Sequence, residues 1–139
     1  MDKALSDFKT NFRKKAPASR DELSTVEYIL HTKLPADLED WYLYSNGGAG
    51  GVGNFAFLQF WPIHNLIDRN SDIEISKKIP SSIIFGSDGG EEMYGVTVIA
   101  DEVRYFEVPN EDMEIDNLKY IGNSFKEFIN YLSNWNPTN

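Results

Sequence analysis

Two apolar runs on either side of a glycine-rich acidic segment constrain the fold of this chain more than any other feature. The first run ends at Phe85 and the second begins at Met93. Between them lie three glycines and three carboxylates, namely Gly86, Gly89, Gly90, Asp88, Glu91 and Glu92. Apolar runs that stop at glycine are typical of β-strands joined by a turn. We therefore expect two strands joined by an exposed seven-residue loop, residues 86–92, and long ordered loops are often functional.

The spacing of apolar residues changes along the chain from helical to strand-like and back to helical. The helical patterns cover residues 2–15, 20–31, 35–45, 63–69 and 124–134. The strand-like patterns cover residues 54–61, 82–85, 93–99 and 103–108. Ser19 with Glu22, and Ser124 with Glu127, match the capping box that begins many helices. The patterns predict an α+β fold in a single domain, residues 1–139, with its core over about residues 19–135.

The core and the exposed segments are predicted from the same patterns. Trp41, Phe85 and Phe128 are each the largest apolar group in their run, so we expect them in the core. Residues 70–78 and the acidic residues 110–117 are polar and are expected to form exposed loops.

A second glycine-rich segment follows the helix expected over residues 35–45. Residues 48–53 match the dinucleotide-binding pattern G-x-G-x-x-G. That pattern needs a strand before it and a helix after it, whereas here a helix precedes and a strand-like run follows. We interpret the segment as a flexible turn, and Asn46 and Gly47 before it as the left-handed end of the helix.

The composition indicates a folded protein with an acidic body. Hydrophobic residues make up 41% of the chain, which argues against intrinsic disorder. The net charge is −9, with +2 in residues 1–33 and −11 in residues 34–139. This balance disfavours nucleic acid and anionic membranes as partners and favours basic proteins, although acidic surfaces also promote solubility. Because the chain has no cysteine, no apolar signal core and no bilayer-length apolar stretch, we expect a cytoplasmic protein.

Catalytic arrangements are poorly supported by the sequence. His31 and His64 have no nucleophile and no metal-ligand spacing beside them, which favours structural roles. Ser87 lies outside a G-x-S-x-G pattern. The loop carboxylates lack the spacing of an EF-hand, and Asp88 is expected to form an Asx-turn. We predict no catalytic residue, no metal site and no cofactor.

Four short motifs in a fixed order carry a resemblance to a known family. They are Glu27 followed by Leu34-Pro35, Asn46-Gly47-Gly48, the run Phe85-Gly86-Ser87-Asp88-Gly89-Gly90, and Ser124-Phe125-Lys126-Glu127-Phe128-Ile129. Across residues 19–132 they resemble the SUKH superfamily, which includes the fungal Smi/Knr cell-wall regulators and many bacterial immunity proteins. The resemblance implies an α+β fold in which N-terminal and C-terminal helices pack on a largely antiparallel sheet. It also implies a binding protein without catalytic residues, with structural loop residues at Asn46, Gly47, Gly48, Gly86, Gly89 and Gly90.

The resemblance and the acidic charge together favour an immunity protein that binds a cognate bacterial toxin, a basic nuclease domain, and occludes its active site. Two alternatives stay open: an intracellular regulatory scaffold of the Smi/Knr type, and a small enzyme or ligand-binding domain that uses the loop 88–92. Glu91 and Glu92 stand where the family often has small residues, so the identity of the partner is open. The predicted contact residues are Asp88, Glu91 and Glu92, then Glu111, Asp112 and Glu114, with Trp61 as an aromatic anchor.

Overall fold

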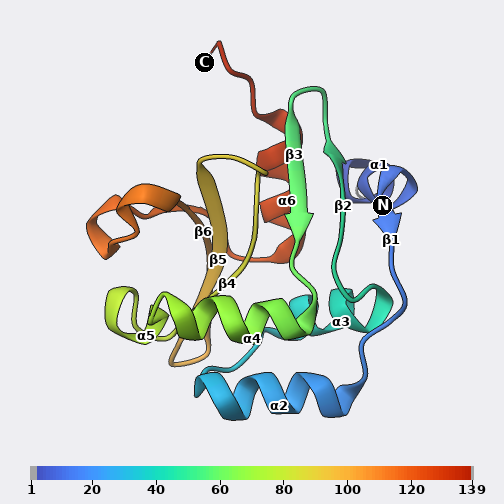
Figure 1. Ribbon diagram of the computed structural model, residues 1–139. Coiled ribbons are helices and arrows are strands. Elements are labelled where there is room, and N and C mark those ends of the chain that lie inside the picture. The colour runs from blue at the N-terminus through green and yellow to red at the C-terminus, as the bar shows by residue number, and fades with distance from the viewer. Residues whose placement is uncertain (1–2, 139) are drawn as a thin grey trace.

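The computed structural model describes residues 3–138, which form one antiparallel sheet with helices on both faces (Figure 1). The strands pair in chain order and are β1 (Arg13–Lys14), β2 (Gly48–Val52), β3 (Ala56–Phe60), β4 (Ser82–Ser87), β5 (Glu92–Ile99), β6 (Glu102–Pro109) and β7 (Lys119–Gly122). The helices are α1 (Lys3–Asn11), α2 (Arg20–Leu30), α3 (Ala36–Tyr44), α4 (Ile63–Asp72), α5 (Ile75–Lys78) and α6 (Phe125–Asn134). Two short 3-10 helices, η1 (Asn110–Asp112) and η2 (Ile115–Asn117), connect β6 to β7. This architecture confirms the predicted α+β fold with a largely antiparallel sheet.

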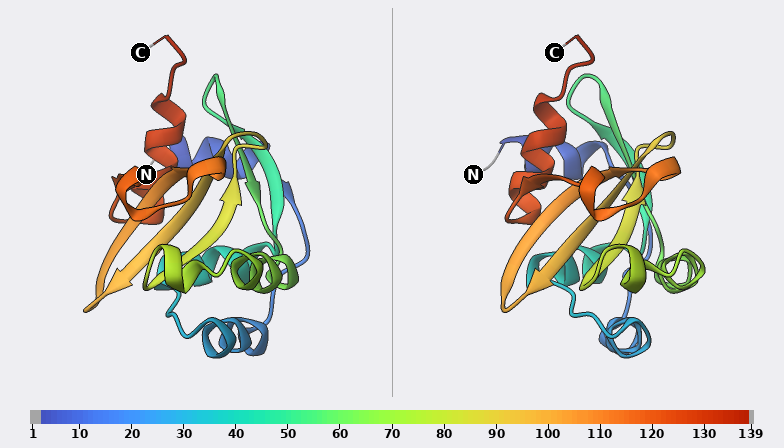
Figure 2. Two further views of the ribbon diagram at one scale, coloured as in Figure 1. Left: turned by 60° about the vertical axis from the view of Figure 1, so that its left-hand side comes forward. Right: turned by 90° about the vertical axis from the view of Figure 1, so that its left-hand side faces the viewer.

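The helices occupy three positions around the sheet. α1 and α6 cover one face, and α5 with η1 and η2 covers the other. α2, α3 and α4 lie together at one end of the sheet, and the turn between β4 and β5 lies at the opposite end (Figure 2). The β4–β5 turn therefore lies away from α2, α3 and α4 (Figure 2).

Side-chain caps begin two of the helices where the sequence predicts them. The Ser19 hydroxyl accepts the Glu22 N–H at 3.1 Å, and the Glu22 carboxylate accepts the Ser19 N–H at 2.9 Å, which confirms the first capping box. At α6 the Ser124 hydroxyl accepts the Glu127 N–H at 3.1 Å. The Glu127 carboxylate accepts the Asn123 N–H instead of that of Ser124, so only half of the second box forms.

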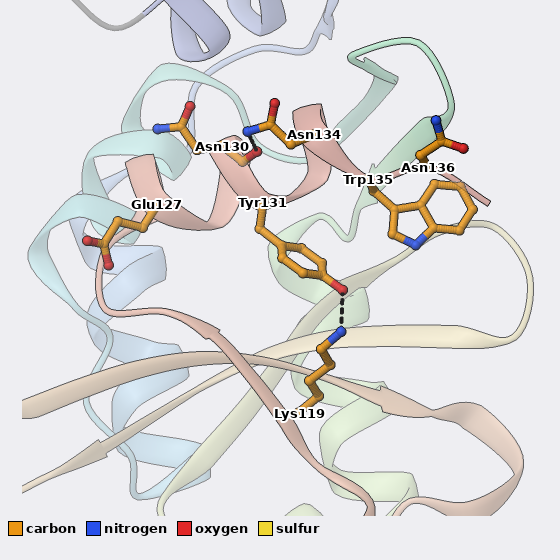
Figure 3. Close-up of a pocket in the computed structure, with 7 residues that line it drawn as sticks. All are labelled: Lys119, Glu127, Asn130, Tyr131, Asn134, Trp135 and Asn136. Atoms are coloured by element: carbon orange, nitrogen blue, oxygen red, sulfur yellow. Dashed lines mark hydrogen bonds between the residues drawn. The ribbon is translucent and has the colours of Figure 1, made fainter. Parts of the chain in front are cut away.

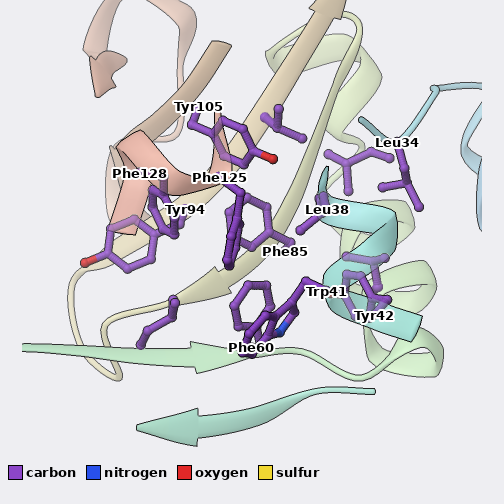
Figure 4. Packing of buried hydrophobic residues seen from close by; sticks show 14 of the residues in the cluster. Leu34, Leu38, Trp41, Tyr42, Phe60, Phe85, Tyr94, Tyr105, Phe125 and Phe128 are labelled. Carbon is purple, nitrogen blue, oxygen red and sulfur yellow. The ribbon is translucent and has the colours of Figure 1, made fainter. Parts of the chain in front are cut away.

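The larger core lies between the sheet and helices α1, α3 and α6, and is rich in aromatic rings (Figure 4). Trp41, Phe85 and Phe128 are buried, with 3%, 0% and 0% of their surface exposed, as predicted. The Phe85 ring stacks on Phe60 with centroids 5.2 Å apart and meets Phe128 edge-on at 5.4 Å. Phe8 of α1 belongs to the same cluster, so the core extends on the N-terminal side of the predicted residues 19–135.

A smaller apolar cluster lies on the opposite face of the sheet. Successive side chains of a strand point to opposite faces, so Ile84 belongs to this cluster and Phe85 to the larger core. Its buried members are Trp61, Ile75, Ile79, Ile84, Phe106, Val108 and Met113. Because both faces are covered here, β4 is buried along its whole length.

The segment 70–78 is helical and partly buried, so the prediction of an exposed loop was wrong. α4 continues to Asp72, α5 follows, and both Asn70 and Ile75 are buried. The Asn70 side-chain amide bonds to the backbone of Ile84, fourteen residues away. A local pattern cannot reveal this partner, because it is brought near only by the folded sheet.

Residues 48–52 of the glycine-rich segment form strand β2, so the interpretation of the segment as a flexible turn was wrong for all but Gly53, which lies in the turn that follows. A Cβ atom on Gly48 would lie 2.6 Å from the Phe12 ring, and one on Gly50 would lie 3.0 Å from the Phe12 Cα. Glycine therefore lets the chain between α1 and β1 pack directly on β2. Phe12 itself follows a helix that is shorter than the predicted 2–15, and residue 2 lies outside the described residues.

Candidate functional site

The loop between β4 and β5 is shorter than the sequence suggests. Gly86 pairs with Tyr94 and Ser87 with Met93 in the sheet, so the exposed turn is residues 88–91. Gly86 is in the strand and has no positive φ. A Cβ atom there would lie 2.4 Å from the Gln59 carbonyl oxygen, so glycine is required by the close approach of β3 rather than by a turn.

The Asp88 carboxylate organises this turn from within. Its Oδ1 accepts the Gly90 N–H at 2.8 Å and the Glu92 N–H at 3.2 Å, which confirms the predicted Asx-turn. The Asp88 N–H donates to the Glu92 carbonyl at 3.1 Å. Gly89 has a φ of +83°, a conformation that glycine adopts without strain. The turn is thus held in one shape, with Glu91 exposed at its end.

The two acidic segments that the sequence singles out lie side by side. The Asn110 N–H donates to the Glu91 carbonyl at 2.7 Å, and Glu92 pairs with Pro109 in the sheet. Glu111 and Asp112 of η1 therefore follow directly beside the β4–β5 turn (Figure 2). We call this end of the sheet the acidic surface; its carboxylates are Asp88, Glu91 and Glu92 of the turn, Glu107 of β6, and Glu111 and Asp112 of η1, which covers the opposite face of the sheet from Glu92 and Glu107. Glu114 follows η1 and is exposed.

Glu107 joins the acidic surface although the sequence analysis missed it. It lies on β6 directly opposite Tyr94, and Glu92 is two residues before Tyr94 on the same face of β5. The Tyr131 hydroxyl donates to the Glu107 Oε1 at 2.8 Å, and the Lys119 Nζ lies 3.9 Å from the same oxygen. Side chains alternate between the two faces along β5 and along β6. Aligning the two strands as a hairpin is therefore the sequence signal that places Glu107 near Glu92.

Negative charge is concentrated at Glu92. Partial burial raises the pKa of the Glu92 carboxyl, and the negative charges of Glu107, Asp88 and Glu91 raise it further. Lys119 acts in the opposite direction and is the smallest of these contributions. A cation supplied by a partner would therefore be attracted to this position.

Trp61 does not lie on the surface. It is 3% exposed, it belongs to the smaller core, and the Arg69 guanidinium lies 4.6 Å from the centre of its ring. The exposed aromatic side chain beside the turn is Phe57, which is 42% exposed. A Cβ atom on Gly89 would lie 3.7 Å from the Phe57 ring. Trp61 is therefore not available as the surface anchor that the sequence predicted.

The two histidines lie apart from the acidic surface. His31 ends α2 in the left-handed conformation, with a φ of +53°, and His64 is exposed near the start of α4. Among residues 3–138, no group of three His, Cys, Asp or Glu side chains is arranged to hold a metal ion. Within the same residues, no helix combines the length and the apolar character that crossing a membrane requires.

The fold and the acidic surface define an α+β domain with one strongly charged end. The model of the SMI1 / KNR4 family (SUKH-1) matches residues 17–131. The chain belongs to this family, as the order of its four motifs predicts. A comparison with curated proteins finds no significant match.

Proposed function

We propose that this protein is an immunity protein that binds a cognate bacterial toxin and neutralises it without performing chemistry itself. The observation that carries the proposal is the acidic surface, in which two segments distant in sequence are joined by the hydrogen bond from Asn110 to Glu91. Membership of the SMI1 / KNR4 family supports it, because the SUKH superfamily, which the four sequence motifs resemble, includes many bacterial immunity proteins.

The negative charge of this surface indicates which class of toxin it would bind. A nuclease binds phosphates, so its active cleft is cationic. Clustered carboxylates present a comparable pattern of negative charge and steer a basic partner toward the surface during encounter. We therefore propose a basic nuclease domain as the partner and occlusion of its cleft as the mode of inhibition.

An exposed aromatic residue beside the charges supplies a second element of a binding surface. Interfaces are held mainly by a few aromatic anchors, while surrounding charges set the rate of association. Phe57 is exposed and lies against the β4–β5 turn. We propose that Phe57 packs into the partner while Glu91, exposed at the end of the turn, faces its cations.

A regulatory scaffold of the Smi/Knr type is the alternative, and the family match favours it to the same degree. Such a scaffold would also bind proteins through an exposed surface. The two functions differ in the partner, because an immunity protein recognises the product of a neighbouring toxin gene.

Co-expression with the product of the neighbouring gene tests the proposal. We expect the two proteins to copurify and the toxin to arrest growth only when this protein is absent. If the neighbouring product neither copurifies nor becomes harmless in the presence of this protein, the immunity function is wrong and the scaffold is the better account.

A further inference from the structure

The outer edge of β6 is only partly covered by its neighbour in the sheet. β7 pairs with residues 105–107 of β6 and with no residue before them. β7 is tied to α6 in this position, because the Lys119 Nζ donates to the Tyr131 hydroxyl at 3.1 Å (Figure 3). Within residues 3–138 no strand pairs with residues 102–104 on that side. The start of β6 is therefore a free edge, at the end of the sheet opposite the β4–β5 turn (Figure 2).

The backbone of Val103 points outward at this free edge. β5 and β6 are joined by a two-residue turn, and in such a hairpin the flanking residues, Ile99 and Glu102, bond to each other. Bonded and non-bonded pairs then alternate along the strands, so Val98 and Val103 do not bond to each other. The Val98 N–H donates instead to the Ser81 carbonyl at 3.1 Å, which agrees with this alternation. Val103 therefore directs its N–H and C=O away from β5, where no hydrogen bond within residues 3–138 satisfies them.

The free edge carries one charge of each sign on the same face of the sheet. Glu102 and Arg104 are two residues apart on β6, so their side chains point to the same side. The Arg104 Nε and Nη2 both donate to the Glu102 Oε1, at 2.9 and 2.6 Å. No hydrogen bond within residues 3–138 uses the Glu102 Oε2 or the Arg104 Nη1. The ion pair can therefore bind a second ion pair of the same kind.

Two exposed apolar side chains lie beside this ion pair. Ile99 is 57% exposed and Tyr120 is 48% exposed, and both line a hollow of about 220 Å³ with Glu102 and Arg104. The Arg104 guanidinium lies 5.2 Å from the centre of the Tyr120 ring. The charges of this patch cancel, whereas the whole chain carries −9. Two copies of the chain, which repel one another through their net charge, can approach most closely at such a neutral patch.

We propose that the free edge of β6 pairs with the same edge of a second copy of this chain, around a two-fold axis at Val103. Antiparallel pairing places the two Val103 residues opposite each other, where they exchange both N–H···O=C bonds. The same register places Glu102 of each copy opposite Arg104 of the other. The acidic surface lies at the other end of the sheet and stays free in the dimer (Figure 2). The inference therefore goes beyond the proposed function and does not depend on it.

Charge reversal at the two positions tests this register, with self-association measured by sedimentation equilibrium. The edge is short, so we expect a weak dimer, with a Kd between about 10 µM and 1 mM. Glu102→Arg places two cations opposite each other at both ends of the edge, and Arg104→Glu places two anions there. Each variant alone should self-associate at least about tenfold more weakly than the parent. An equimolar mixture of the two variants restores opposite charges at both positions and should dimerise as the parent does.

Lys3→Glu is the matched control, because Lys3 forms an exposed ion pair with Asp7 on α1 and the change of charge equals that of Arg104→Glu. It should leave self-association within about twofold of the parent. The proposal is overturned by a parent that is still monomeric at about 1 mM, or by a single variant that dimerises as well as the parent. A mixture of the two variants that stays monomeric overturns it equally.

Discussion

Asn70 and Ile84 are joined by two buried hydrogen bonds that tie α4 to strand β4. The Asn70 Oδ1 accepts the Ile84 N–H at 2.8 Å, and the Asn70 Nδ2 donates to the Ile84 carbonyl at 2.7 Å. Strand β3 pairs with β4 only at Gly86 and Ser87, so it does not reach Ile84. The Asn70 amide therefore supplies the hydrogen bonds of the Ile84 backbone at a point where β3 no longer pairs with β4.

Replacing Asn70 by alanine should be strongly destabilising. The change leaves the N–H and the C=O of Ile84 buried without partners, and each such group costs about 1–3 kcal/mol. We expect Asn70→Ala to lower the free energy of unfolding by at least about 2 kcal/mol, measured by urea denaturation. Asn54→Ala, in the exposed turn between β2 and β3, is the control and should change it by less than about 0.5 kcal/mol. Equal losses in the two variants would contradict this role of Asn70.

Two glycines of the β4–β5 region should differ in how much stability they lose when replaced by alanine. A Cβ atom on Gly86 would meet the Gln59 carbonyl at 2.4 Å, whereas one on Gly90 would come no closer than 3.5 Å to the Asp88 carboxylate. We expect Gly86→Ala to cost about 1–3 kcal/mol of unfolding free energy, because the strands must move apart. Gly90→Ala should be neutral within about 0.5 kcal/mol. Thermal denaturation of the pair checks this, and a neutral Gly86→Ala would show that β3 does not approach so closely.

The charge at Glu92 should make stability depend on pH. Burial and neighbouring carboxylates raise the pKa of Glu92 in the folded chain above its unfolded value. Between those two pKa values the folded state holds more protons than the unfolded state, so stability falls as pH rises through this interval. Glu92→Gln removes the charge and should be more stable than the parent at pH 7, with the difference vanishing in acid. Urea denaturation across pH measures it, and a variant less stable than the parent at pH 7 would contradict the cause given for the shift.

Local patterns were sufficient for much of the fold. The capping box of Ser19 and Glu22 and the apolar spacing of α6 depend on residues within a few positions of one another. The hairpin of β5 and β6 was also predictable, because the strand-like runs 93–99 and 103–108 flank a short connection, which in the structure is only Ala100 and Asp101. These elements follow from neighbours in the chain, which is the information that a sequence pattern contains.

The errors arose where a distant contact decides the structure. The local sequence around Asn70 is typical of a loop, and only the contact with Ile84 in the folded chain explains why Asn70 is buried in a helix. The glycines of β2 indicate flexibility until Phe12 is packed on them. β7 was not predicted, because residues 119–122 are few and half of them are exposed, and only pairing with β6 makes them a strand.

In the candidate site, too, features set by neighbouring residues were predictable and features set by distant contacts were not. The carboxylates of the β4–β5 turn were predictable from their position between two strands. The union of the turn with η1 depends on the long-range bond from Asn110 to Glu91, and the inclusion of Glu107 depends on the register with Tyr94. Trp61 was misplaced because its aromatic run is equally compatible with either face of the strand.

The central claim is that the acidic surface receives a basic toxin, and association kinetics test it most directly. The measurement is the association rate constant of this protein with the neighbouring toxin at several salt concentrations. The variant Glu91→Lys/Glu92→Lys is compared with Asp68→Lys/Asp72→Lys, which makes the same change of charge on α4. We predict that the first variant associates at least about tenfold more slowly at low salt and with a flatter salt dependence, while the second changes far less. A Glu91→Lys/Glu92→Lys variant that associates as fast as the parent would contradict the account.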